Sequence, residues 1–128
     1  MAIVRNPVTL EVIEMKRVPL IPALGSEESI GKRLEGLSAL IYCWAPWCGP
    51  CQNSSPIVYQ LSHDPDLSHI TFVSVNTDDC DLAAEELFVR SIPSLFVWKD
   101  NEVVDFVIGV TAYEELKQMI LKNLPVPV

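Results

Sequence analysis

The sequence predicts an α/β domain with a central mixed β-sheet flanked by four helices. Segments typical of strands and of helices alternate along most of the chain, which favours parallel strands joined by helical crossovers. Near the end, two strand-like segments follow each other and predict an antiparallel hairpin. The 128 residues, 49% hydrophobic and 20% charged, suffice for one domain with its own core. The expected organisation is an extension over 1–19, a domain over 20–124 and a tail over 125–128.

The first elements are the hardest to predict. The apolar–polar alternation over 8–15 suits a short strand or an ordered arm. A short edge strand is expected at 20–24, because edge strands tolerate a proline such as Pro22. Ser26 is the expected N-cap of a first helix that runs to about Glu35, just before a glycine that would end it.

The middle of the chain predicts two buried strands around a long helix. The run 37–44 is almost wholly apolar and is bounded by turn residues, so we expect a central strand covered on both faces. A helix over 49–63 follows, with Pro50 in its first turn and Pro56 expected to kink it. A second apolar strand is predicted over 70–75.

The last part of the chain predicts a helix, a hairpin and a final helix. Thr111 and Glu114 have the spacing of a capping box, in which two side chains satisfy backbone N–H groups of the first helical turn. We therefore expect the final helix to begin at this box. The expected bounds are 78–89 for the first helix, 95–98 and 103–108 for the strands, and 111–123 for the last helix.

The chain is acidic, and its charge is unevenly placed. Nine Lys and Arg against seventeen Asp and Glu give a net charge of −8, and residues 34–89 hold eight acidic side chains with no Lys or Arg. Nucleic acid and anionic membranes are not expected as partners, because both attract clustered positive charge. The acidic segment is either a solvated face or a surface that selects basic partners.

A membrane anchor or a secretory signal is not expected. No apolar run approaches the roughly 18 residues that span a bilayer, and charges at Arg5, Glu11 and Glu14 interrupt the N-terminal segment. The four cysteines are too few for a disulfide scaffold, and Cys48 and Cys51 are only three residues apart. This spacing is typical of working cysteines in a reducing compartment, so we expect a cytoplasmic protein.

Cys48 and Cys51 carry the chemistry that the sequence predicts. They lie where a buried strand gives way to a helix N-terminus, whose free N–H groups and dipole favour the Cys48 thiolate. Cys48 can then attack a disulfide, and Cys51 can resolve the resulting mixed disulfide by bonding to Cys48. Pro50 stiffens the turn between them, which favours a reductant over an oxidant.

The stretch from Trp44 to Cys51, WAPWCGPC, resembles the active-site sequence of the thioredoxin family. The resemblance implies the thioredoxin fold and a protein-disulfide reductase with Cys48 as nucleophile and Cys51 as resolver. It covers about 20–124 and continues at Pro56, at Asp78-Asp79-Cys80, at Ile92-Pro93-Ser94 and at Gly109.

Other properties follow from the same resemblance. It implies no bound cofactor beyond the redox-active Cys48–Cys51 disulfide and no metal. Electrons are expected from an NADPH-dependent thioredoxin reductase, the expected substrates are proteins that contain disulfides, and the chain is expected to be a monomer. Pro93 is expected in cis. The implied site residues are Trp47, Gly49 and Pro50 for the active-site turn, and Trp47, Ile92, Pro93 and Gly109 for a groove that receives an extended substrate strand.

Three positions depart from the family pattern. Tyr42 stands where the family has a buried aspartate that helps to take the proton of the resolving cysteine, Ser74 replaces a lysine near that acid, and Gln52 replaces another lysine. A phenol with an ordinary pKa near 10 is a poor base at neutral pH. We therefore expect resolution by Cys51 to rely on water and to release reduced substrate more slowly.

Alternative functions follow from the same residues. The apolar groove could belong to a binding module whose dithiol is a redox switch for a dedicated partner, with residues 1–19 as a docking arm. Zinc binding is not expected, since neither His63 nor His69 offers a second paired ligand spacing. Cys43 is expected to be a packed core thiol, whereas Cys80 is considered also as an exposed regulatory thiol.

Overall fold

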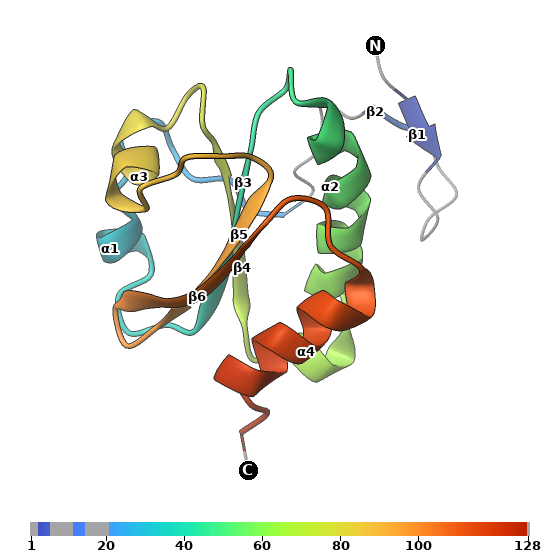
Figure 1. The fold of residues 1–128 in the computed structure, drawn as a ribbon. Coiled ribbons are helices and arrows are strands. Elements are labelled where there is room, and N and C mark those ends of the chain that lie inside the picture. Colours follow the sequence, from blue (N-terminus) through green and yellow to red (C-terminus); the bar gives the residue numbers. More distant parts are fainter. Residues whose placement is uncertain (1–2, 6–11, 15–20, 128) are drawn as a thin grey trace.

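A mixed four-stranded sheet forms the centre of the protein in a computed structural model that describes residues 3–5, 12–14 and 21–127 (Figure 1). The strand order is β4-β3-β5-β6, so β3 has a partner on each side. β3 runs parallel to β4 and antiparallel to β5, and β5 pairs antiparallel with β6. The predicted mixed sheet is therefore confirmed. Its strands are β3 (Ala39–Trp44), β4 (Thr71–Asn76), β5 (Ser94–Lys99) and β6 (Glu102–Ile108).

Two helices cover each face of this sheet, as Figure 1 shows. The longer pair, α2 and α4, packs on one face, and the shorter pair, α1 and α3, packs on the other. The described residues also include a 3₁₀ turn, η2 (Pro65–Leu67), and a separate pair of antiparallel strands, β1 (Ile3–Arg5) and β2 (Val12–Glu14). The helices are α1 (Ile30–Arg33), α2 (Gly49–Ser62), α3 (Asp81–Glu86) and α4 (Tyr113–Asn123).

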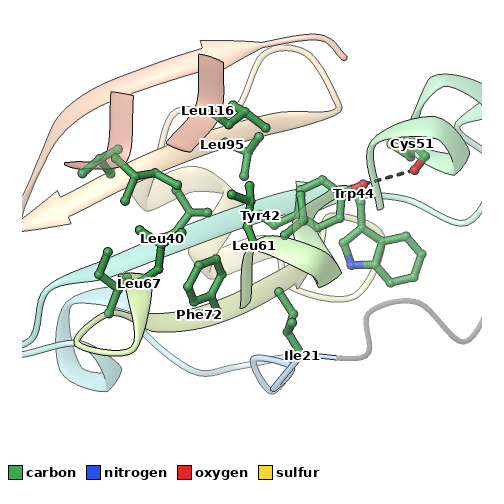
Figure 2. Packing of buried hydrophobic residues seen from close by; sticks show 14 of the residues in the cluster. Ile21, Leu40, Tyr42, Trp44, Cys51, Leu61, Leu67, Phe72, Leu95 and Leu116 are labelled. Carbon is green, nitrogen blue, oxygen red and sulfur yellow. Dashed lines mark hydrogen bonds between the residues drawn. The ribbon is translucent and has the colours of Figure 1, made fainter. Parts of the chain in front are cut away.

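β3 lies at the middle of the core, and all six of its residues are buried. Side chains of a strand alternate between the two faces of a sheet. Accordingly, Leu40, Tyr42 and Trp44 belong to the cluster beneath α2 and α4, while Ile41 and Cys43 belong to the cluster beneath α1 and α3. This placement confirms the predicted central strand and directs Tyr42 toward α2, the helix that carries Cys51 (Figure 2).

The first helix begins later than predicted. Ser29, not Ser26, is the N-cap, and its Oγ accepts the N–H of Lys32 at 3.3 Å. The carboxylate of Glu86 fixes this start because it accepts both the Ser29 hydroxyl and the Ile30 N–H at 2.7 Å. The prediction at Ser26 was wrong because a residue more than fifty positions away, on α3, decides where α1 begins.

The capping box predicted at Thr111 and Glu114 is also wrong. The N-cap of α4 is Ala112, which makes no side-chain cap hydrogen bond. Contacts to the loop after α2 hold the first turns of α4: the Tyr113 hydroxyl donates to Asp64, and the Lys117 ammonium lies 3.0 Å from the same carboxylate. The Tyr113 hydrogen bond, followed by contacts from Asp66 and Lys117, holds the pKa of Asp64 below its ordinary value.

The two hairpin strands lie within one residue of their predicted bounds, whereas the helix predicted over 78–89 is shorter and spans only Asp81–Glu86. The hairpin turns at Asp100 and Asn101, which both have positive φ, as a tight two-residue hairpin turn requires. The predicted edge strand at 20–24 is reduced, within the described residues, to one parallel bridge between Ala23 and Ser74. Of the predicted strand at 8–15, β2 is described and the remaining residues lie outside the described part.

Candidate active site

Cys48 and Cys51 meet at the N-terminus of α2, directly after the loop that leaves β3. Cys48 is the N-cap, the two sulfurs form a disulfide, and the Cα atoms are 5.3 Å apart. The Cys51 N–H donates to the Cys48 sulfur at 3.2 Å. A sulfur that caps a helix accepts a free N–H group and faces the positive end of the helix dipole, so the reduced form favours a thiolate on Cys48.

The turn between the cysteines faces solvent. Gly49 and Pro50 are exposed, and apart from its chain neighbours and the helix backbone no atom lies within 4 Å of the position that a Cβ of Gly49 would take. Trp47 is 70% exposed, and its indole N–H donates to Asp78 at 3.0 Å, which fixes the ring beside the dithiol. The predicted exposure of Trp47 is confirmed. Both cysteines are only 3% exposed, whereas the turn between them and Trp47 are open to solvent.

A hollow of about 400 Å³ lies beside the active-site turn, and Trp47 and Ile92 both line it. The Ile92–Pro93 peptide bond is cis, as predicted, and Pro93 is buried. The Pro93 carbonyl accepts the N–H of Gly109 at 2.8 Å, and Gly109 has a φ of 93°, which favours glycine. Of the predicted groove residues, Trp47 and Ile92 thus border the hollow, and Pro93 and Gly109 are joined by a hydrogen bond.

A larger hollow of about 840 Å³ lies over β5 and β6 on the face of the sheet that α1 and α3 cover. Phe88, Phe106 and Ile108 line it and are exposed. It includes neither the cysteines nor Trp47, but it shares Arg90 and Ser91 with the hollow beside the active-site turn.

Tyr42 lies directly beneath the dithiol, where the family resemblance implies an acid. Its side chain is 1% exposed, and its hydroxyl donates to the Cys51 carbonyl oxygen at 3.3 Å (Figure 2). The same hydroxyl lies 2.7 Å from the Ser54 Oγ and 2.6 Å from the Ser55 Oγ. Burial raises the pKa of Tyr42, so its phenol is neutral at physiological pH. Sequence reasoning missed Ser54 and Ser55.

Ser74 occupies the position predicted for the lost lysine. It pairs with Tyr42 in the parallel register of β3 and β4 and is 1% exposed. Its hydroxyl donates to the carbonyl of Pro22 at 3.4 Å. The neighbouring positions Tyr42 and Ser74 thus carry neutral side chains that both have hydrogen-bond partners, which avoids the cost of burying an unpaired charge.

The two other cysteines lie in the core beneath α1 and α3. Cys43 is fully buried, which confirms the predicted packed core thiol, and this burial raises its pKa to about 12. Cys80 is 1% exposed, and its S–H donates to the Leu24 carbonyl at 3.4 Å. The hypothesis of an exposed regulatory thiol at Cys80 is therefore wrong, because the loop before α1 covers the sulfur.

Comparisons with known proteins agree with this geometry. The family model for thioredoxin matches residues 27–122. A thioredoxin of Porphyra purpurea is 42% identical over 88 residues, which are 69% of this chain and 81% of that protein. Thioredoxin 1 of a Nostoc strain is 38% identical over 85 residues, which are 66% of this chain and 78% of that protein. The crystal structure of Malassezia sympodialis thioredoxin superposes with a TM-score of 0.66 at 27% identity and covers 83% of this chain and 96% of its own. With the family's fold, and with a Cys48–Cys51 disulfide at the N-terminus of α2, this chain belongs to the thioredoxin family and is a thiol–disulfide oxidoreductase.

Proposed function

We propose that Cys48 is the nucleophile and Cys51 the resolver of protein-disulfide reduction. The Cys48 thiolate attacks one sulfur of a substrate disulfide, forms a mixed disulfide and releases the first substrate thiolate. The Cys51 thiol then gives up its proton and attacks the Cys48 sulfur, which releases the second substrate thiolate and forms the Cys48–Cys51 bond. The observation that carries this assignment is the capped position of the Cys48 sulfur at the start of α2.

We propose further that the substrate strand lies across Trp47 and Ile92, beside Pro93 and Gly109. The exposed indole and the adjoining hollow of about 400 Å³ support this placement, because an extended peptide needs an apolar surface and free backbone partners. Acidic side chains of the β4–α3 loop, including Asp78 and Asp79, are exposed at the same end of the molecule. They support the expectation that basic segments of a substrate bind well.

The remaining steps of the cycle are also proposals. An NADPH-dependent thioredoxin reductase is the proposed electron donor, because the oxidised Cys48–Cys51 pair needs two electrons before each turnover. The free thiols of Cys43 and Cys80 suit a reducing compartment, for which we propose the cytoplasm. We propose a monomer.

Within the described residues, none of the helices has the length and apolar character that crossing a bilayer demands.

Coupled turnover tests this proposal. Wild-type protein, NADPH, a thioredoxin reductase and insulin are mixed, and the absorbance of NADPH at 340 nm is followed. We expect NADPH oxidation in proportion to the insulin disulfides, and none when either the protein or insulin is left out. In a second reaction, dithiothreitol replaces NADPH and the reductase. If the protein accelerates insulin reduction by dithiothreitol but supports no NADPH oxidation in the first reaction, the proposed electron donor is contradicted and the dithiol chemistry is not.

A further inference from the structure

A cluster of three buried hydroxyl groups lies beneath Cys51. We call Tyr42, Ser54 and Ser55 the hydroxyl cluster; each of the three residues is at most 2% exposed. Tyr42 projects from β3, and the two serines lie three and four positions after Cys51 on α2, on the helix face that carries Cys51. Residues from two different elements are therefore joined directly under the resolving cysteine.

The hydrogen bonds of the hydroxyl cluster converge on one backbone atom, the carbonyl oxygen of Cys51. The Tyr42 hydroxyl donates to it at 3.3 Å, and the Ser54 Oγ lies at the same distance from it. Because each hydroxyl has one proton, the Tyr42 oxygen in turn accepts from the Ser54 and Ser55 hydroxyls, whose Oγ atoms lie 2.7 Å and 2.6 Å away. A carbonyl bonded to a phenol that two serines hold in place has a fixed peptide plane, which fixes the Cα–Cβ bond that aims the Cys51 sulfur.

The hydroxyl cluster cannot act as a base. Burial raises the pKa of Tyr42 above its ordinary value near 10, and the two serines are neutral hydroxyls. No group of the cluster therefore takes up a net proton at neutral pH. The role left for the cluster is to position groups: it ties the first turn of α2 to β3 at the centre of the sheet.

We propose that Tyr42, through the hydroxyl cluster, is a positioning residue for the resolving step. It holds the Cys51 sulfur where the thiolate attacks the Cys48 sulfur of the mixed disulfide, forms the Cys48–Cys51 bond and expels the substrate thiolate, while the proton of Cys51 goes to water. This proposal rests on the proposed function, in which Cys51 resolves a mixed disulfide on Cys48. The proposed role concerns only the second step, the attack by Cys51 on the mixed disulfide. The first step, the attack by Cys48 on the substrate, does not involve the Cys51 carbonyl.

The aromatic disulfide 5,5′-dithiobis(2-nitrobenzoate) separates the two steps in one experiment. Attack by Cys48 on this probe releases one thionitrobenzoate, and attack by Cys51 on the mixed disulfide releases a second. Both are followed at 412 nm in stopped flow with the reduced full chain. Tyr42→Phe keeps the ring and removes one hydroxyl. We expect its first release to stay within twofold of wild type and its second to slow about three- to tenfold, as expected for losing one neutral hydrogen bond.

Tyr59→Phe is the matched control, because Tyr59 also lies on α2 and contributes no hydroxyl to the cluster. We expect both of its release rates to match wild type. Ser54→Ala serves as a second variant should Tyr42→Phe fail to fold, and its second release is expected to slow likewise. Ser62→Ala is its control, since the Ser62 hydroxyl bonds to the Tyr59 carbonyl, away from Cys51.

A pH profile separates positioning from proton transfer. We expect the second release to rise with pH through one ionisation, that of Cys51, with the same apparent pKa in wild type and in Tyr42→Phe. An unchanged second release in Tyr42→Phe, an equal slowing of both releases, or a shifted apparent pKa would each overturn the proposal. Failure of the proposed function looks different: wild type would give no second release, or Cys48→Ser would still give the first.

Discussion

Cys48→Ser is expected to reduce the acceleration of insulin reduction to the background rate of dithiothreitol alone. A serine hydroxyl does not ionise near neutral pH, so the attack that begins each cycle is lost even though the N-terminus of α2 can still be capped. Turbidity of precipitating insulin B chains gives the rate. Cys51→Ser is expected to lose turnover too, but to accumulate a mixed disulfide on Cys48 that intact-mass spectrometry detects.

Cys80→Ser is the control for the loss at Cys48. Cys80 also occupies an N-cap, that of α3, but it is buried beneath the loop before α1 and forms no disulfide. Its substitution is expected to leave insulin reduction near the wild-type rate. Activity that survives in Cys48→Ser and disappears in Cys80→Ser would place the nucleophile elsewhere and contradict the assigned site.

Leu40→Ala is expected to lower the free energy of unfolding by about 2–5 kcal/mol. Leu40 is fully buried on β3, where it packs in the same cluster as Tyr42 and Leu61 beneath α2 (Figure 2). Truncation removes buried apolar surface and leaves a cavity that the central strand cannot close by collapsing. Urea denaturation of the oxidised protein, followed by tryptophan fluorescence, gives the value.

Leu37→Ala is the matched control, because Leu37 lies three residues earlier and is 42% exposed. Its expected cost is within about 0.5–1 kcal/mol, as for most surface substitutions. Equal losses in Leu37→Ala and Leu40→Ala would mean that β3 is not the central buried strand on which the positions of Tyr42 and the dithiol depend.

The dithiol could be placed from the sequence because every determinant is local. An apolar run ends at Trp44, three residues before Trp47, and Pro50 stands in the first helical turn. The spacing of Cys48 and Cys51 brings their sulfurs together on one turn. The mixed character of the sheet was also predictable, because alternation of strands and helices, followed by a hairpin, leaves few topologies.

The errors in helix starts came from contacts between distant segments. Ser26 and Ser29 are equally good N-caps by propensity, and only the Glu86 carboxylate, which bonds Ser29 and the Ile30 N–H, decides between them. A capping box at Thr111 was a reasonable local signal, yet α4 is positioned by contacts between its first turns and Asp64. Local patterns cannot contain such information.

The hydroxyl cluster was missed although part of its signal is in the sequence. Ser54 and Ser55 follow Cys51 by three and four residues, the spacing that places side chains on one helix face. Their significance depends on Tyr42, which reaches them from β3. A tyrosine in an apolar run is most simply predicted as core packing, and only the docking of α2 on the sheet shows where its hydroxyl goes.

The reduction potential of the Cys48–Cys51 pair tests the central claim, reduction of protein disulfides by this dithiol, most directly. The protein is equilibrated in a series of thiol–disulfide buffers, alkylated and weighed intact. Thioredoxin itself has a potential of about −270 mV, and protein disulfide isomerase one of about −180 mV. We predict a single two-electron transition near the first value. A transition near the second, or no Cys48–Cys51 bond in any buffer, would contradict the account.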